Sequence, residues 1–369
     1  MTATHQTRFG GRYQPQKLIG TGGMSKVYRC LDTTTNKAVA VKVFTESGQT
    51  TPILLARFER EILALQQVSH PYIVRLLDYA LTPDESYLVM PYFESGSVAD
   101  RLSRQLYTPQ EAVQLLTEIA FALDYAHSQG YFHTDLKPSN LLMDKHGHIY
   151  LSDFGLATSI AAHTSITGDG DIFGTPAYMA PELISGAPPS SRTEVYALGV
   201  ILYELLTGHR PFSAPSLSVL IEMQRTGTPP PASALNSDLP AALDDVPLTA
   251  LAKLPSARPA TAGGFAQQFT RAVLALPERE RNTRPAIKPR PPGVGAPEEL
   301  RTLIFDHATP GGTPKAAAAK RPEVNQREHQ TPAPKQARSG RWFVIVLELS
   351  VAVLLLTAGY LLITLIMKR

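Results

Sequence analysis

The stretch "YFHTDLKPSN", residues 131–140, brings a carboxylate, an ammonium and a carboxamide close together in the chain. Asp135 could accept a proton from a hydroxyl group, and Lys137 could neutralise a phosphate. Asn140 could contribute an amide oxygen to a metal site. These groups predict a catalytic loop, and the uncharged Thr134 directly before the acid is a feature that needs an explanation.

A second acid follows this loop in "LSDFGLA", residues 151–157. Asp153 comes after a predicted strand, and Gly155 allows a sharp turn behind it. Two carboxylates and one amide oxygen are a suitable donor set for Mg²⁺. The sequence therefore predicts a metal site in which Asn140 and Asp153 take part.

A glycine-rich segment lies upstream, in "IGTGGMSKV", residues 19–27. Gly20, Gly22 and Gly23 would let the backbone approach phosphates closely. The segment fails the P-loop pattern because no Gly-Lys-Ser/Thr triplet follows, and it fails the dinucleotide fingerprint because Ser25 holds the third glycine position. On this segment alone, an ordinary glycine-rich hairpin stays an open alternative.

A lysine interrupts the apolar strand "VAVKV", residues 39–43. Burying the ammonium of Lys42 alone is costly, so it needs an anion. A nucleotide phosphate or a carboxylate would serve, and Glu61 on the following predicted helix is the candidate carboxylate. The alternative is that Lys42 extends to solvent along its aliphatic stem.

Two segments downstream carry a complementary pair of charges. "FGTPAYMAPEL", residues 173–183, contains Glu182, and "PSARP", residues 255–259, contains Arg258. Because an isolated buried charge is costly, we predict that Arg258 is a buried partner of Glu182.

In their order and spacing, these motifs resemble the protein kinase superfamily, in particular the eukaryotic-like Ser/Thr kinases of bacteria. The resemblance covers about residues 13–273, through the glycine loop, Lys42, Glu61, "HTDLKPSN", "DFG" and "APE". It implies an α+β, two-lobed protein kinase fold. A small antiparallel β lobe with one helix, residues 13–91, would precede a larger helical lobe, residues 92–275.

The resemblance also implies the nucleotide site, with ATP and Mg²⁺ as cofactors and Mn²⁺ as an alternative ion. The glycine loop would cover the phosphates, Lys42 would hold the α- and β-phosphates, and a hinge from residue 90 to 93 would bond adenine. The residues expected to contact the nucleotide are Ile19, Gly20, Thr21, Gly22, Gly23, Val27, Ala40, Lys42, Met90, Tyr92, Phe93, Leu142 and Asp153.

The catalytic roles follow from the same resemblance. Asp135 would orient or deprotonate the acceptor hydroxyl, and Lys137 would steady the transferred phosphate. Glu61 would position Lys42. The metal ligands would be Asn140 and Asp153.

The implied function is a serine/threonine protein kinase that transfers the γ-phosphate of Mg·ATP to proteins, including itself. Lys137, together with Thr175 in "GTPAYMAPE", is similar to the Ser/Thr-specific branch. The alternative is a membrane-tethered pseudokinase scaffold that binds nucleotide without efficient transfer. Turnover of nucleotide distinguishes the two.

Departures from the family pattern affect residues beside the site. Many kinases carry Arg at the position of Thr134, and that cation needs an anionic partner, usually a phosphate on the activation loop. We therefore hypothesise that this chain does not need a loop phosphate for activity. Glu194 stands where the family usually has Asp, which bonds the catalytic-loop backbone, so its longer side chain would have to fold back. Pro91 replaces an acidic hinge residue.

The composition is compatible with one or two domains and excludes some classes. The chain has 369 residues, of which 43% are hydrophobic, and a net charge of +3, so nothing in the charge balance demands a nucleic-acid partner. Cys30 is the single cysteine, so no disulfide framework exists and a reducing compartment fits. The N-terminus shows no apolar segment of a cleavable signal peptide.

Local patterns predict the elements of the globular part. Alternating and β-branched residues indicate strands at 17–20, 26–32, 37–44, 72–81 and 86–93. Apolar residues at helical spacing indicate helices at 52–68, 108–130 and 194–208. The predicted organisation is an N-terminal extension (1–12), a kinase domain (13–275), a disordered Pro-, Ala- and Lys/Arg-rich linker (276–341) and a transmembrane helix (342–367).

The segment Trp342–Met367 contains a single charge, Glu348. As a helix it would be roughly 39 Å long, which is enough to cross a bilayer. We expect a single-pass protein of the cell membrane with its kinase domain in the cytoplasm. Pairing of Glu348 with a partner helix, and hence a homodimer, is an alternative to its reaching the headgroups.

Overall fold

The computed structural model describes residues 8–22, 25–44, 62, 68–82, 86–153 and 176–290. The chain divides into two compact units, Met1–Pro310 and Gly311–Arg369, and all of the described residues belong to the first. Within these ranges, no helix combines the length and apolar character needed to span a membrane. The predicted transmembrane helix, 342–367, lies outside the described residues.

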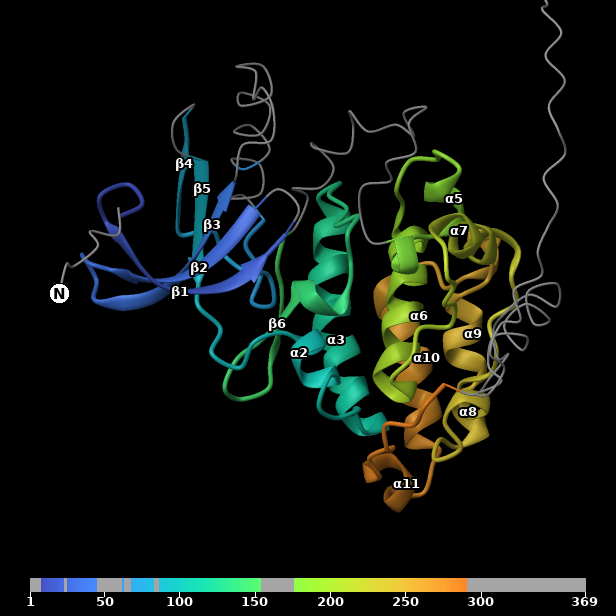
Figure 1. The fold of residues 1–369 in the computed structure, drawn as a ribbon. Coiled ribbons are helices and arrows are strands. Elements are labelled where there is room, and N and C mark those ends of the chain that lie inside the picture. The colour runs from blue at the N-terminus through green and yellow to red at the C-terminus, as the bar shows by residue number, and fades with distance from the viewer. Residues whose placement is uncertain are drawn as a thin grey trace, which may run out of the picture. The chain divides into compact units, whose positions relative to one another are not determined.

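A five-stranded antiparallel sheet forms the N-terminal lobe (Figure 1). Its strand order is β1-β2-β3-β5-β4. The alternation of apolar and polar residues lets one face of the sheet close over a small core, which contains Cys30 and Val41. The strands are β1 (Tyr13–Thr21), β2 (Ser25–Asp32), β3 (Lys37–Phe44), β4 (Asp78–Leu81) and β5 (Ser86–Pro91).

One predicted strand differs from the structure. Of residues 72–81, only the last four form a strand, β4. The preceding residues connect to the other lobe instead, because Ile73 forms an isolated bridge with Leu151 and the Val74 N–H donates to the Leu151 carbonyl at 2.9 Å. The other predicted strands are confirmed, while the predicted helix 52–68 lies outside the described residues except for its Ile62 and Val68.

Two long helices organise the C-terminal lobe. Helix α3 (Pro109–Ser128) begins at Thr108, whose hydroxyl accepts the Glu111 N–H while the Glu111 carboxylate accepts the Thr108 N–H. Helix α6 (Ser191–Thr207) begins three residues before the predicted start, because Ser190 caps it, and it ends at Gly208 in a left-handed conformation. Both predicted helices are confirmed.

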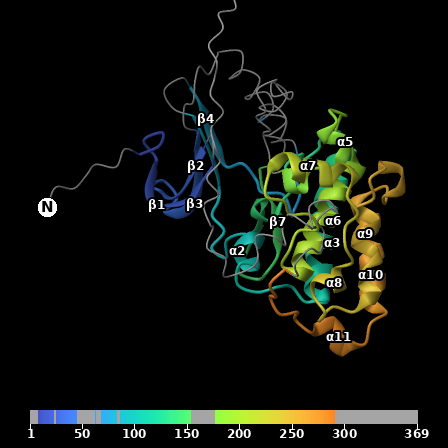
Figure 2. The ribbon, with the colours of Figure 1, turned by 45° about the vertical axis from the view of Figure 1, so that its right-hand side comes forward.

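The remaining helices and one hairpin pack around these two. Helices α3, α6 and α10 lie side by side, as Figure 2 shows, and bury the large core of this lobe. The hairpin of β6 (Leu141–Met143) and β7 (Ile149–Leu151) packs against α3. The sheet followed by a larger helical lobe confirms the predicted α+β architecture. The other helices are α2 (Val98–Leu102), α5 (Pro181–Ile184), α7 (Leu217–Thr226), α8 (Ala232–Leu235), α9 (Asp245–Ala250), α10 (Ala262–Leu274) and α11 (Glu278–Asn282).

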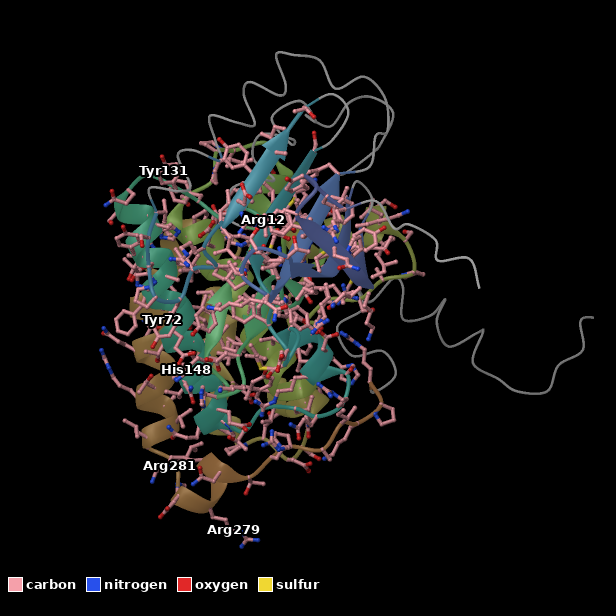
Figure 3. All side chains as sticks on the ribbon, turned by 90° about the vertical axis from the view of Figure 1, so that its left-hand side faces the viewer. Arg12, Tyr72, Tyr131, His148, Arg279 and Arg281 are labelled. Atoms are coloured by element: carbon pink, nitrogen blue, oxygen red, sulfur yellow. The ribbon has the colours of Figure 1, made fainter. Side chains whose placement is uncertain are left out.

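The folded part continues past residue 275, the predicted end of the domain. Helix α11 presents Arg279 and Arg281 (Figure 3), and residues 283–290, here called the strap, then return along the helical lobe. The composition of 276–290 predicted disorder, but its polar side chains have specific partners. Lys288, for example, pairs with Asp238 at 2.5 Å.

Candidate active site

The catalytic loop is held by a buried carboxylate from α6. Glu194 Oε1 accepts the backbone N–H groups of both His133 and Thr134, the latter at 3.0 Å. Thr134 has φ of +63°, a region that L-residues with branched side chains rarely adopt. Because Glu194 is only 2% exposed, these bonds hold the strained backbone in a dry environment.

The side chain of Glu194 also makes a second contact, with a histidine. Its Oε2 lies 2.6 Å from Nε2 of His127, which belongs to the last turn of α3. The prediction that Glu194 contacts the loop is confirmed, whereas His127 was missed. Its position in the sequence could have indicated this role, because His127 lies at the end of the predicted helix that leads directly into the catalytic loop.

Three predicted residues meet at one carboxylate. Lys137 Nζ lies 2.6 Å from Asp135 Oδ2, and Asn140 Nδ2 lies 3.2 Å from the same oxygen. Asn140 also donates to the Asp135 carbonyl at 2.8 Å. The short 3-10 turn Pro138–Asn140 brings the amide back over the acid. The amide nitrogen of Asn140 therefore faces Asp135, and the amide oxygen is the atom of this side chain that can bind a cation.

The lysine of β3 has a carboxylate partner. Lys42 Nζ lies 2.7 Å from Asp153 Oδ1, although the two residues are 111 positions apart. The alternative in which Lys42 extends to solvent is therefore wrong. Asp153 has φ of +57°, which Asp tolerates better than most residues. The predicted carboxylate partner, Glu61, lies outside the described residues, and the pairing of Lys42 with Asp153 was not predicted.

A buried serine links the two predicted metal residues. Both the N–H and the hydroxyl of Ser152 donate to the Asn140 carbonyl, at 2.9 and 3.0 Å. The Ser152 carbonyl in turn lies 2.8 Å from Nε2 of His133, which is fully buried. Asn140 and Asp153 thus stand at the open end of one hairpin, β6–β7, and are fixed relative to each other.

The described residues of the glycine-rich segment lie at the end of β1 and the start of β2. The Gly22 N–H donates to the Ser25 carbonyl at 2.7 Å, and Thr21 pairs with Lys26. Gly20 pairs with Val27 across the two strands, so both predicted nucleotide residues face the same part of the lobe. Ile19 is 40% exposed on this edge of the sheet. Gly23 lies outside the described residues.

The other predicted nucleotide residues lie on β3, near the end of β5 and directly after it, and on β6. Ala40 pairs with Met90 between adjacent strands. Tyr92 carries the Arg29 guanidinium 5.3 Å from its ring centre, and the Phe93 ring centre lies 4.9 Å from that of Tyr150. Leu142 forms a bridge with Ser97, which joins β6 to the start of α2. These residues therefore connect the sheet lobe to the helical lobe.

Comparison with known proteins identifies the fold. Residues 13–283 match the family described as the protein kinase domain. This chain belongs to the protein kinase family. It is 36% identical over 247 residues to a probable serine/threonine-protein kinase PknB of Lactococcus lactis, a match that covers 66% of this chain and 39% of that protein.

Longer matches lie among relatives with the same description. Serine/threonine-protein kinase PknH of Mycobacterium bovis is 33% identical over 355 residues, or 93% of this chain and 59% of PknH. PrkC of Bacillus subtilis is 30% identical over 359 residues, or 97% of this chain and 53% of PrkC. The chain spans between 39% and 59% of the length of these three relatives. The domain is therefore of the serine/threonine protein kinase type.

Solved structures agree with this assignment. The kinase domain of Mycobacterium tuberculosis PknI, as a double mutant, superposes with a TM-score of 0.57 at 26% identity. The match covers 74% of this chain and 99% of that domain. The two-lobed protein kinase fold predicted from the motifs is confirmed.

The kinase domain has oxygen donors suitable for a divalent ion. Within the described ranges, no group of three or more His, Cys, Asp or Glu residues could hold a metal ion alone. Mg²⁺ commonly takes one or two carboxylates and completes its shell with phosphate and water. Asp153, with the amide oxygen of Asn140, fits that requirement, so the residues are compatible with Mg²⁺ bound together with a nucleotide.

The predicted pair of Glu182 and Arg258 is confirmed in the kinase domain. Arg258 Nη1 and Nη2 lie 2.6 and 2.8 Å from the two carboxylate oxygens of Glu182, and the guanidinium is fully buried. Burial alone would raise the pKa of Glu182, but the bond and charge of Arg258, a backbone hydrogen bond and the bond from Thr193 together outweigh it and lower the pKa. The pair joins the start of α5 to the turn after α9.

Proposed function

We propose that this protein is a serine/threonine protein kinase that transfers the γ-phosphate of Mg·ATP to hydroxyl groups of proteins. The observation that carries the proposal is the convergence of Lys137 and Asn140 on the carboxylate of Asp135. The relatives, named serine/threonine-protein kinases, support the choice of acceptor.

Asp135 is the group that receives the acceptor hydroxyl. Its carboxylate orients the hydroxyl and takes its proton as the oxygen attacks the γ-phosphorus. The new oxygen–phosphorus bond forms while the bond from the γ-phosphorus to the bridging oxygen breaks, and ADP leaves. Lys137, 2.6 Å from Asp135, neutralises charge on the phosphoryl group during transfer.

Lys42, Asn140 and Asp153 would hold the nucleotide that donates the phosphoryl group. Asn140 and Asp153 would hold Mg²⁺, which neutralises the phosphates and aligns the transferred group. Lys42 pairs with Asp153 at 2.7 Å, and its ammonium is the group that holds the α- and β-phosphates. Every charge that phosphoryl transfer requires from the chain is present, so no observation favours the pseudokinase scaffold.

The test uses the full-length chain, purified in mild detergent, with Mg²⁺ and labelled ATP. Asp135→Asn is the matched variant, because it retains the size of the side chain and removes the base. Label on Ser or Thr that disappears in this variant supports the proposal. Nucleotide binding without transfer by the unmodified chain would contradict it and favour the scaffold. If the fraction of the chain that becomes labelled per unit time does not depend on the chain concentration, autophosphorylation takes place within one molecule.

We further propose that the chain is anchored in the cell membrane by residues 342–367, with the kinase domain in the cytoplasm. The support is the apolar sequence of this segment and the need of the domain for ATP. Fractionation of cells expressing the full chain, beside one truncated after residue 341, tests the anchor. Recovery of both chains in the soluble fraction would contradict it. Crosslinking with and without Glu348 tests the predicted dimer.

The hypothesis on loop phosphorylation remains a prediction. The segment between "DFG" and "APE" offers Thr158, Thr164, Ser165 and Thr167 as phosphate acceptors. A variant with alanine at all four positions is expected to retain transfer to an added protein substrate. Loss of that transfer would contradict the interpretation of Thr134.

A further inference from the structure

The strap contacts the helical lobe through a bidentate ion pair. Arg284 Nη1 lies 2.8 Å from Glu111 Oε2, and Nη2 lies 2.9 Å from Glu111 Oε1. Nη1 also donates to the carbonyl of Leu106. Glu111 occupies the first turn of α3, where its carboxylate completes the capping box. One arginine of the strap therefore fixes the start of the helix that leads to the catalytic loop.

Glu111 holds a second cation, which comes from α2. Arg101 Nη2 lies 2.6 Å from Glu111 Oε1, and the guanidinium stacks 4.0 Å from the ring centre of Tyr107. Burial alone would raise the pKa of Glu111, but bonds from Arg284, from the Thr108 N–H and from Arg101 lower it to about 2. The carboxylate is therefore ionised at neutral pH and can bind both guanidinium groups together.

Helix α2 is in turn attached to the strand beneath the predicted nucleotide site. Ser97 caps α2 and forms a bridge with Leu142 on β6. The next residue of β6, Met143, donates its N–H to the Gly96 carbonyl at 2.8 Å. The family resemblance implies that Leu142 contacts the nucleotide. A displacement of α2 would therefore move a predicted wall of the nucleotide site.

We propose that Arg284 is a positioning residue for the nucleotide site and acts through Glu111 and Arg101 on α2 and Leu142. The inference rests on the proposed function, because it takes Leu142 as a nucleotide contact. Arg284 lies one residue beyond the end of the family match at 283, and its partner Glu111 lies within the match. The positioning is local, since each step is an ion pair or a backbone bridge between neighbouring elements.

The rest of the strap supplies a matched control. Lys288 pairs with Ser237 and Asp238, at 2.9 and 2.5 Å, in the turn after α8. Arg284→Gln and Lys288→Gln each remove one positive charge and one ion pair from the same segment. The two changes differ in that the partner of Arg284 also holds α2. Any effect of the strap on stability is common to both variants, whereas an effect on nucleotide affinity belongs to Arg284.

The experiment measures Mg·ADP binding to the full-length chain by calorimetry, and the Michaelis constant for ATP and the turnover number with a protein substrate. Arg284→Gln is expected to weaken Mg·ADP binding and to raise the Michaelis constant for ATP by about threefold to tenfold, with turnover nearly unchanged. Lys288→Gln is expected to leave both constants unchanged. Arg284→Lys, which keeps one bond to Glu111, should recover part of the affinity. Arg101→Gln should weaken nucleotide binding less in the Arg284→Gln background than in the unmodified chain.

The outcomes separate the inference from the proposed function. Equal nucleotide affinity of Arg284→Gln and the unmodified chain, or equal loss in Arg284→Gln and Lys288→Gln, overturns the positioning role. A change in turnover without a change in affinity also overturns it. If the unmodified chain binds Mg·ADP but transfers no phosphate, the proposed function fails while the affinities still decide the role of Arg284. A chain that binds no nucleotide overturns both.

Discussion

The two sides of the candidate active site are built differently. On the side of the helical lobe, the loop before Asp135 is held by Glu194, and Asn140 is held by both Asp135 and Ser152. On the side of the sheet, Lys42 pairs with Asp153 at 2.7 Å and is 16% exposed, and Ile19 is 40% exposed. The loop side is held by a buried hydrogen-bond network around Glu194, whereas on the sheet side Lys42 is held by a single, partly exposed ion pair.

Because of this difference, substitutions on the two sides should affect the stability of the fold and phosphoryl transfer differently. A buried network stabilises the fold as well as the site, because removal of one member leaves other buried groups without partners. A single, partly exposed ion pair contributes little to the free energy of unfolding, because its charges are screened by water. Substitutions on the loop side should therefore change stability and transfer together, and substitutions on the sheet side should change transfer alone.

The largest effect is expected for Glu194→Ala. The substitution leaves the N–H groups of His133 and Thr134 and the ring of His127 without their buried acceptor. We expect the free energy of unfolding to fall by about 3–5 kcal/mol, because several buried donors lose their acceptor at a cost of about 1–3 kcal/mol each. Transfer should fall more than about 100-fold because Asp135 loses its orientation. Urea denaturation and the phosphoryl-transfer assay measure the two.

Glu222→Ala is the control for this variant. Glu222 lies on α7 with a 58% exposed side chain, and its partner Arg225 is 3.6 Å away. Its removal should change the free energy of unfolding by less than about 0.5 kcal/mol. If the two alanine variants had similar stability, the loop side would not be the rigid network described above.

Lys42→Met tests the sheet side. The methionine keeps most of the volume of the side chain and removes the ammonium that is paired with Asp153. We expect transfer to fall by about 10²–10³-fold, comparable to the loss of one charge-stabilising group in an active site. The free energy of unfolding should change by less than about 1 kcal/mol, because the pair is partly exposed.

Lys37→Met, on the same strand, is the matched control for Lys42. Lys37 is exposed at the start of β3. It should retain full transfer and the stability of the unmodified chain. A Lys42→Met variant as unstable as Glu194→Ala would contradict the proposed separation between the two sides.

The groups proposed to act on the substrate were easier to predict from the sequence than the groups that hold them. Asp135, Lys137, Asn140 and Asp153 are recognisable because phosphoryl transfer demands particular charges at particular spacings. The pair of Glu182 and Arg258 was also predictable, since a charge in an apolar setting needs a partner. These inferences need chemistry and order along the chain, and no three-dimensional information.

The supporting residues depend on contacts between distant elements. Ser152 is an ordinary serine in the sequence, and only the pairing of β6 with β7 places it on the Asn140 carbonyl. The strap was predicted to be disordered because its composition lacks apolar residues. Its order comes from complementary charges, Arg284 with Glu111 and Lys288 with Asp238, which composition cannot reveal. Residues 72–77 formed no strand because their partner, Leu151, belongs to the other lobe.

A smaller effect concerns the bond between His127 and Glu194. Glu194→Asp shortens the side chain, so the carboxylate can keep the loop or the histidine but not both. His127→Ala should lower the free energy of unfolding by about 1 kcal/mol in the unmodified chain and by much less in the Glu194→Asp background. A double-mutant cycle by urea denaturation measures the difference. Equal losses in both backgrounds would show that His127 does not act through Glu194.

The smallest effect is expected at the rear of the loop side, where His148 supports β7. Its Nδ1 lies 2.7 Å from Oε1 of Glu118, whose Oε2 accepts the Ile149 N–H, and Figure 3 shows His148 on the same face as Tyr72. The bond to Glu118 raises the pKa of His148 above its ordinary value of 6.5. The resulting stabilisation is therefore fully present below about pH 6.5 and is lost as pH rises through the pKa of the folded state.

His148→Gln isolates this contribution. Because the side chain is 46% exposed, solvent screening should limit the effect to a few tenths of a kcal/mol. The unmodified chain should lose more stability than His148→Gln between pH 6 and pH 8.5, and His146→Gln, on the same turn, should behave like the unmodified chain. Parallel curves of stability against pH for all three proteins would mean that the bond between His148 and Glu118 contributes no stability. The boundary of the rigid side would then lie at Glu118.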